Sequence, residues 1–224
     1  MRKAWISFTG GKDCHLAMVE AQQEGLDIVG LVTFAPAGGA DTFKAHPMSI
    51  IKEQAAAMGL LHVIKLICPG EGSNGYVEAY RERIRELREE SGADVLVTGD
   101  ILDVCDGFMA RACENTGLHL HTPLWQRPRE DILQSLENRK FELVISCVSI
   151  EKMGKERAEG LVGEAWVPGL ITEEENVDLC GEFGEYHTMV TYVPDLYKRK
   201  IGVRGKQALD DTGKYLYFQF SPSQ

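Results

Sequence analysis

Residues 7–15 read SFTGGKDCH and directly follow the apolar run Ala4–Ile6. A buried strand that ends in a glycine pair and leads into a helix is the expected start of an α/β fold. Such a turn can also bind an anion, because unpaired backbone N–H groups and the positive end of the helix dipole face the same point. The residues alone leave a second interpretation open, an ordinary glycine turn with a solvated Lys-Asp pair.

Two familiar nucleotide motifs do not match this turn. A Walker A loop needs GxxxxGK[ST], but Gly10–Lys12 is followed by Asp13, and the GxGxxG spacing is absent as well. The physical basis for phosphate binding remains, since glycines let a ligand approach the backbone and lysine supplies a positive charge. We therefore expect a phosphate site, with hydroxyl donors at Ser7 and Thr9.

The first half of the chain alternates β-rich runs with helical patterns, which predicts βαβ units and a parallel sheet. The expected strands are residues 4–8, 28–34, 61–68 and 94–98. The expected helices are residues 12–24, 46–59, 76–92 and 103–115.

The pattern changes after about residue 124. A helix is expected over 127–140 and a buried strand over 141–150, and short turn-rich β segments begin near Val177. We expect two domains, a parallel-sheet domain over 1–124 and a smaller α+β substrate domain over 125–224.

A second glycine turn follows the fourth expected strand, in the segment VLVTGDI. In a doubly wound sheet, ligands bind outside the carboxyl ends of the strands where the strand order reverses. If the first and fourth strands flank that reversal, Gly99 and Asp100 face the same crevice as Gly10–Lys12. A carboxylate beside a phosphate site can hold Mg²⁺, although Asp100 as a simple helix cap is the competing interpretation.

The segment CGEFGEYHT, residues 180–188, carries Glu182, Glu185 and His187. Two carboxylates three residues apart with a nearby imidazole can bind a cation or move protons. A glycine-bent hairpin with solvated charges is the alternative.

Composition limits the class of protein. The 224 residues carry a formal net charge of -10, which argues against a nucleic-acid-binding protein. Six scattered cysteines without a CxxC pair favour a reducing compartment and no zinc site. No secretory signal or membrane-spanning stretch is visible, so a cytoplasmic protein is expected.

SFTGGKDCHLA resembles the SxSGGKDS pyrophosphate loop of the PP-loop ATP pyrophosphatases. Its combination with TGDI, HTPLW and CGEFGEYHT, in this order from Ser7 to about Thr188, is similar to the diphthine–ammonia ligase family. The resemblance implies a Rossmann-like (HUP-type) nucleotide-binding domain over 1–124 with a smaller C-terminal α+β domain. It also implies an amide ligase that uses ATP, Mg²⁺ and ammonium and acts on diphthine of elongation factor 2 through an acyl-adenylate, with release of AMP and pyrophosphate.

The resemblance implies roles for thirteen residues. The nucleotide would be bound by Ser7, Thr9, Gly10, Gly11, Lys12, Asp13, Cys14, His46, Gly99 and Asp100. The metal would be held by Asp13 and Asp100. The catalytic residues would be Lys12, Glu182, Glu185 and His187.

Three positions depart from the family pattern. Thr9 replaces a serine and keeps the hydroxyl, Cys14 replaces a serine with a potential nucleophile, and Phe183 stands where a smaller residue is expected. These changes leave open a PP-loop enzyme that acts on another carboxylate or on tRNA. A non-catalytic adenine-nucleotide sensor is the alternative from a different class.

Overall fold

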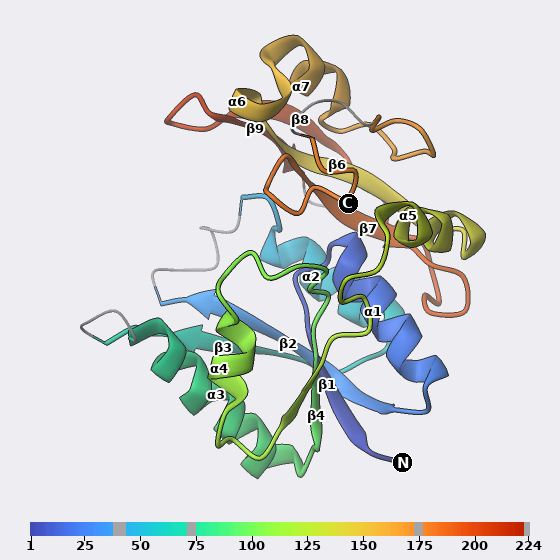
Figure 1. Cartoon of the computed structure of the whole chain (residues 1–224). Helices are drawn as coiled ribbons and strands as arrows, with labels where there is room; N and C mark the ends of the chain where they lie inside the picture. The colour runs from blue at the N-terminus through green and yellow to red at the C-terminus, as the bar shows by residue number, and fades with distance from the viewer. Residues whose placement is uncertain (38–43, 71–74, 173–176, 222–224) are drawn as a thin grey trace. The chain divides into compact units, whose positions relative to one another are not determined.

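The computed structural model describes residues 1–37, 44–70, 75–172 and 177–221 (Figure 1). The chain divides into two compact units. The first unit comprises Met1–Thr9, Asp13–Thr42 and Leu60–Gln126, and the second comprises Gly10–Lys12, Phe43–Gly59 and Arg127–Gln224. The domain boundary expected at residue 124 stays a prediction.

A five-stranded parallel sheet organises the first unit. Its order is β3-β2-β1-β4-β5, and every neighbouring pair is parallel. The strands are β1 (Lys3–Ser7), β2 (Asp27–Pro36), β3 (His62–Ile67), β4 (Val95–Val97) and β5 (His119–His121). The expected Rossmann-like α/β class is confirmed, and so is the expected adjacency of the first and fourth strands.

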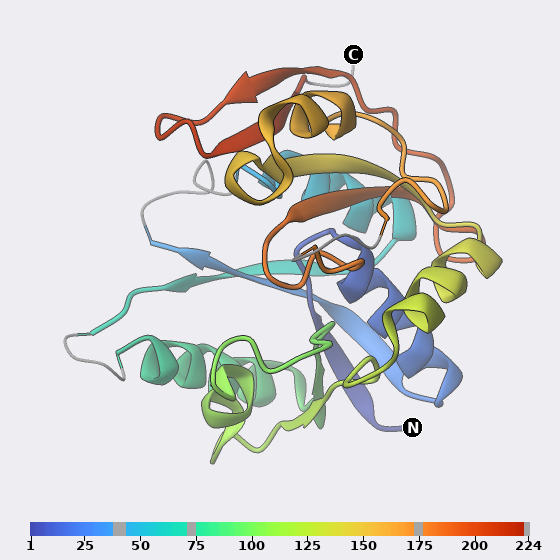
Figure 2. The same cartoon turned by 45° about the horizontal axis from the view of Figure 1, so that its top comes forward.

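Helices cover both faces of this sheet. Figures 1 and 2 show α1 (Lys12–Gln23) on one face and α3 (Gly75–Ser91) and α4 (Phe108–Cys113) on the other. One continuous apolar core joins α3 and α4 to the sheet, because side chains of all three pack together. Its fully buried members include Val32 of β2, Ile84 and Leu87 of α3, Leu96 of β4 and Ala112 of α4.

The fourth helix is shorter than the sequence predicts. Asp106 and Gly107 have positive φ angles of 51° and 62°, which a right-handed helix does not accommodate. The Gly107 N–H instead donates to Asp103 Oδ1 at 2.6 Å, so the backbone turns before the helix begins at Phe108. The result is an irregular loop over residues 102–107 next to the end of β4.

The second unit contains an antiparallel sheet in the order β7-β6-β9-β8. An antiparallel sheet accompanied by helices confirms the expected α+β class of the C-terminal part of the fold. Its strands are β6 (Glu142–Ser149), β7 (Tyr186–Tyr192), β8 (Gly205–Leu209) and β9 (Tyr215–Phe220). Its helices are α2 (Met48–Met58), α5 (Arg129–Asn138), α6 (Ile150–Met153) and α7 (Lys155–Leu161).

Helix α2 belongs to this second unit although it connects two strands of the parallel sheet in sequence. The Lys198 N–H donates to the Ala57 carbonyl at 2.9 Å, and Arg199 pairs with Glu53 at 3.2 Å. The segment after β7 therefore holds α2 against the second sheet.

Gly99 permits the close approach of β4 to the start of α1. A Cβ atom at Gly99 would lie 2.6 Å from the Asp13 carbonyl carbon and 2.7 Å from the Cys14 nitrogen. Backbone atoms cannot move aside cheaply in a packed interior, so only glycine fits. The carboxyl end of β4 is thereby held at the first turn of α1.

We expect Gly99→Ala to lower the free energy of unfolding by about 1–3 kcal/mol, as overpacking commonly does. Gly160→Ala is the matched control, because a Cβ there meets nothing within 4 Å and the residue lies in α7. That control should raise stability by about 0.5–1 kcal/mol through helix propensity. Urea unfolding of the two variants measures both effects, and equal stability for Gly99→Ala and the parent protein would contradict the packing argument.

Candidate functional site

In the first unit, the expected nucleotide residues gather at the carboxyl ends of β1 and β4. Asp13 lies in the first turn of α1, and the main chain at Asp13 and Cys14 touches Gly99. Cys14 is buried, and its sulfur lies 3.9 Å from Thr9 Oγ1. Ser7 ends β1 and is half-buried. These residues lie where a doubly wound sheet binds ligands, at the reversal of strand order.

Asp100 is the second carboxylate at this edge. Its Oδ2 accepts a 2.7 Å hydrogen bond from Thr98 Oγ1. Burial raises the pKa of Asp100 above its ordinary value, and the carboxylates of Asp13 and Asp103 raise that pKa further, while the Thr98 bond opposes the shift. The carboxylates of Asp13 and Asp103 are therefore each close enough to repel that of Asp100, and a bound cation would relieve that repulsion.

The chemistry of this carboxylate pair suits Mg²⁺. Among the described residues, no group of three or more His, Cys, Asp or Glu side chains is arranged to hold a metal ion. Mg²⁺ commonly takes only one or two protein carboxylates and completes its shell with water and substrate phosphates. Asp13 and Asp100 fit that requirement, whereas a structural zinc or calcium site needs more protein ligands.

In the second unit, the main chain of Gly10–Lys12 is held by α2 and β7. The Val190 N–H donates to the Gly10 carbonyl at 3.0 Å, and the Lys12 N–H donates to Thr188 Oγ1 at 3.1 Å. Gly10 has a φ of 81°, a conformation that favours glycine. The glycine turn therefore has a defined backbone.

Gln54 of α2 is a site residue that sequence reasoning missed. The side chain is fully buried, and its Nε2 donates to the Gly10 carbonyl at 2.9 Å and to the Val190 carbonyl at 2.8 Å. The sequence does indicate that Gln54 is buried, because it lies at helical spacing from the apolar residues Ile50, Ile51 and Met58. A polar residue on a buried helix face needs hydrogen-bond partners, and here they are backbone carbonyls.

The Lys12 side chain is buried, with 3% of its surface exposed. Its Nζ donates to the Cys180 carbonyl at 2.5 Å and lies 5.4 Å from the centroid of the Tyr186 ring. Both contacts favour the charged ammonium, one through a carbonyl dipole and the other through the ring face. An ammonium carries three N–H donors, so the Cys180 bond is chemically compatible with a phosphate contact.

His46 and His187 lie beside this lysine in the second unit. Their ring centroids are 5.1 Å apart in an edge-to-face arrangement. Burial lowers the pKa of His187 to about 4, and the charge of Lys12 contributes to that decrease. His187 is therefore neutral near pH 7, with a ring nitrogen able to accept a proton.

Glu185 is buried and organises the loop in which it lies. Its Oε1 accepts from the Asp178 N–H at 3.3 Å, and its Oε2 accepts from the Phe183 N–H at 3.1 Å. Asp178 acts in the same way, because its Oδ1 accepts from the N–H groups of Cys180 and Glu182. The loop is thus shaped by its own carboxylates, and the Cys180 carbonyl that binds Lys12 is part of it.

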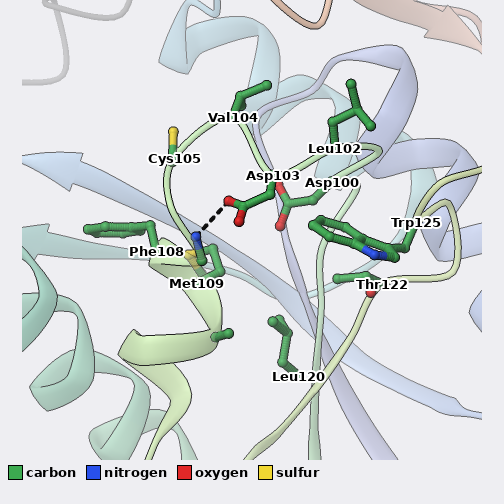
Figure 3. Close-up of a pocket in the computed structure, with 12 residues that line it drawn as sticks. Asp100, Leu102, Asp103, Val104, Cys105, Phe108, Met109, Leu120, Thr122 and Trp125 are labelled. Atoms are coloured by element: carbon green, nitrogen blue, oxygen red, sulfur yellow. Dashed lines mark hydrogen bonds between the residues drawn. The ribbon is translucent and has the colours of Figure 1, made fainter.

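A cavity of about 290 Å³ opens in the first unit beside Asp100 (Figure 3). It lies at the carboxyl ends of β4 and β5, next to the 102–107 loop and α4. Sequence reasoning did not predict it, because β5 and the irregular loop were not recognised. Its lining includes two carboxylates, two apolar side chains and an indole ring, from Asp100, Asp103, Met109, Leu120 and Trp125.

The parallel sheet, its strand order and the helices on both faces define an α/β protein of the Rossmann-like class, and the reversal of strand order lies between β1 and β4. The chain belongs to the diphthamide synthase family, since residues 1–120 match the family model for the diphthamide synthase N-terminal domain. This confirms the resemblance found in the sequence motifs.

Full-length relatives agree with that assignment. Proteins named diphthine–ammonia ligase from Bos taurus and Homo sapiens are each 25% identical to this chain, and the alignments cover 90% of it and 82% of the relative. The Danio rerio protein of the same name is 27% identical, with coverage of 86% and 83%. Across the part of the chain described above, every helix is too short or too polar to cross a membrane.

We expect Gln54→Leu to lower the free energy of unfolding by about 2 kcal/mol, because it removes the two buried hydrogen bonds that the amide donates to the Gly10 and Val190 carbonyls. The control is Gln134→Leu in α5, where the side chain is exposed, and its effect should stay within about 0.5 kcal/mol. Thermal and urea unfolding provide the comparison. A Gln54→Leu protein as stable as the control would mean that the buried amide contributes nothing.

The depressed pKa of His187 predicts an acid-sensitive fold. Between about pH 6.5 and about pH 4 the unfolded chain binds a proton at this imidazole and the folded chain does not, so stability falls as pH falls. The shift corresponds to roughly 3 kcal/mol over that window. In His187→Gln the free energy of unfolding should depend less on pH in this window than in the parent protein. Identical pH profiles for parent and His187→Gln would refute the assignment.

Proposed function

We propose that this protein is an ATP-dependent ligase that converts diphthine on elongation factor 2 to diphthamide with ammonia, releasing AMP and pyrophosphate. Family membership and the names of relatives aligned over 90% of the chain support a ligase of this pathway. The main structural support for the proposal is the close contact of Gly99 with the main chain of Asp13 and Cys14. This contact places the turn after β4 beside the start of α1, at the edge where doubly wound sheets bind ligands.

In the first step, an oxygen of the acceptor carboxylate attacks the α-phosphorus of ATP. The bond from that phosphorus to the bridging oxygen breaks, and its electrons leave with pyrophosphate, which gives an acyl-adenylate. Hydroxyl groups of Ser7 and Thr9, the Gly10–Gly11 backbone and the Lys12 ammonium would bind the leaving pyrophosphate. Charge develops on that group as the bond breaks, so donors placed there lower the barrier.

In the second step, the nitrogen of ammonia attacks the acyl carbon. The bond from that carbon to the adenylate oxygen breaks, AMP departs, and the nitrogen loses a proton as the amide forms. His187 is neutral and would accept this proton, with His46 beside it. Glu182 would attract the ammonium ion, and Glu185 would act by fixing the loop that contains Glu182.

Asp13 and Asp100 would hold Mg²⁺, which supplies positive charge to the phosphates when bound. Cys14 stands in the first turn of α1, where its buried thiol adds little hydrogen-bonding capacity. The net charge of -10 suits an acceptor with a cationic group, since diphthine carries a trimethylammonium. Elongation factor 2 and ammonium are therefore the proposed partners.

The decisive experiment measures AMP formed from ATP and Mg²⁺ with a diphthine-bearing elongation factor 2, with and without ammonium. We expect AMP and diphthamide in equal amounts, the latter detected by mass spectrometry. AMP formation with other carboxylates or with tRNA, but not with diphthine, would identify a different substrate. ATP binding without AMP under every condition would indicate a nucleotide sensor.

Lys12→Met tests the phosphate role. The variant keeps the aliphatic length of the side chain and should lower AMP formation by about 100-fold or more, as loss of one transition-state donor commonly does. Lys206→Met is the control, because Lys206 is exposed on β8. Melting temperatures of both variants separate lost catalysis from lost folding. Unchanged AMP formation by folded Lys12→Met would rule out a role in binding pyrophosphate.

A further inference from the structure

The cavity beside Asp100 combines apolar walls with negative charge at one side. Figure 3 shows the carboxylates of Asp100 and Asp103 next to each other, the indole ring of Trp125 beside Asp100, and Met109 and Leu120 further along the space. All of these residues belong to the first unit. An aromatic ring, aliphatic side chains and two carboxylates are the surroundings that a methylated cation prefers.

Trp125 is unusually exposed for a tryptophan, with 41% of its surface accessible. A tryptophan side chain usually packs against other parts of its own protein, because burial of the large indole ring is strongly favourable. Here the ring instead forms a wall of an open cavity. The exposed ring face is thus available to a ligand.

The carboxylates are fixed in place by hydrogen bonds. Asp103 Oδ1 accepts from the Gly107 N–H at 2.6 Å, and Asp100 Oδ2 accepts from Thr98 Oγ1 at 2.7 Å. Asp103 lies close enough to Asp100 for their like charges to oppose each other. Hydrogen bonds therefore hold two negative charges beside an aromatic ring, an arrangement that a bound cation would stabilise.

We propose that this cavity binds the quaternary ammonium group of the acceptor side chain. The inference rests on the proposed ligase function and names the part of the acceptor that the first unit recognises. A bare metal ion would keep its water shell against the aliphatic walls, whereas methyl groups on nitrogen bury favourably there. The cavity of about 290 Å³ has room for a trimethylammonium group, and its volume lies at the lower end of the roughly 300–1,000 Å³ of drug-sized ligand sites.

Covalent geometry of the acceptor supports this position. In diphthine the trimethylammonium nitrogen and the reacting carboxylate are attached to the same carbon, so their two binding sites must adjoin. Asp100 belongs both to the cavity lining and to the carboxylate pair proposed for Mg²⁺. A cation bound against Trp125 and Asp103 would therefore place its carboxylate near the phosphate edge of the sheet.

Two small probes test the charge requirement directly. Trimethylglycine carries a trimethylammonium group and a carboxylate on one carbon, and tert-butylacetate has the same shape with a carbon atom in place of the cationic nitrogen. Isothermal titration calorimetry at low ionic strength should show tert-butylacetate binding about tenfold more weakly than trimethylglycine. Equal affinities would overturn the proposal.

Single substitutions locate the binding. Asp103→Asn keeps an oxygen that can accept from the Gly107 N–H and removes only the charge, so trimethylglycine should bind about fivefold to tenfold more weakly. Trp125→Leu should weaken it by a similar factor through loss of the ring face. Asp106→Asn is the control, because the Asp106 side chain is 98% exposed and lies outside the cavity lining, and its affinity should equal that of the parent.

The outcomes separate this proposal from the ligase function. AMP formation with a diphthine acceptor, together with trimethylglycine affinity unaffected by Asp103→Asn and Trp125→Leu, would overturn the cavity and keep the ligase. Trimethylglycine affinity that depends on both residues, without AMP from any acceptor, would support a cation site and overturn the ligase. Loss of adenosine binding in Trp125→Leu, with trimethylglycine binding unchanged, would assign the cavity to the base and overturn the proposal.

Discussion

The first unit depends on one close backbone contact, in which Gly99 at the end of β4 lies against the main chain of Asp13 and Cys14. The lack of a side chain at Gly99 lets the strand end reach the first turn of α1. The parallel pairing of β1 with β4 brings the two chain segments to the same sheet edge. Asp100 follows directly in sequence, so the same contact determines the distance between its carboxylate and that of Asp13. The negative edge of the sheet is therefore a consequence of a steric requirement.

The second unit shows how buried polar side chains fix a backbone. The turn residues Gly10–Lys12 belong to this unit. The Gln54 amide donates a hydrogen bond to the Gly10 carbonyl, and Thr188 Oγ1 accepts one from the Lys12 N–H. Glu185 and Asp178 use their carboxylates in the same manner within the 178–186 loop. A buried polar group without a partner costs more free energy than a satisfied one gains. These bonds therefore specify a single conformation for the turn and for the loop whose Cys180 carbonyl binds Lys12.

Sequence patterns predicted the elements that long apolar runs define. The first four strands, α3 and the adjacency of β1 and β4 follow from periodicity and from the rule that parallel strands place ligand turns at one edge. Strand β5 was missed, because its three residues include His119 and His121 and give no apolar run. Helix α4 was predicted too long, since positive φ angles at Asp106 and Gly107 depend on a local hydrogen bond that periodicity does not encode.

Side-chain roles were harder to predict than elements. A Glu-x-x-Glu pattern has the same letters whether a carboxylate faces a ligand or its own loop, and only the structure reveals that both oxygens of Glu185 accept backbone N–H groups. For Gln54 the helical spacing of its apolar neighbours indicates a buried side chain, but its hydrogen-bond partners at Gly10 and Val190 lie far away in the sequence and only the structure reveals them. The roles of the remaining predicted residues stay predictions, since ligand contacts depend on atoms that the chain does not contain.

Charge links the two ligand groups proposed for the first unit. Burial makes the ionised form of Asp100 unfavourable, and the carboxylates of Asp13 and Asp103 each add repulsion. Mg²⁺ at Asp13 and Asp100 would lower this repulsion at one side, and an acceptor cation at Asp100 and Asp103 would lower it at the other. The two cations also repel each other. Binding of one therefore strengthens or weakens binding of the other, depending on whether the relief of carboxylate repulsion or the repulsion between the cations is larger. Asp100 is shared by both groups, so whichever cation binds first offsets part of the unfavourable energy of this buried charge. Occupation of either position therefore changes the electrostatic free energy of binding at the other, along the edge where Gly99 meets the start of α1.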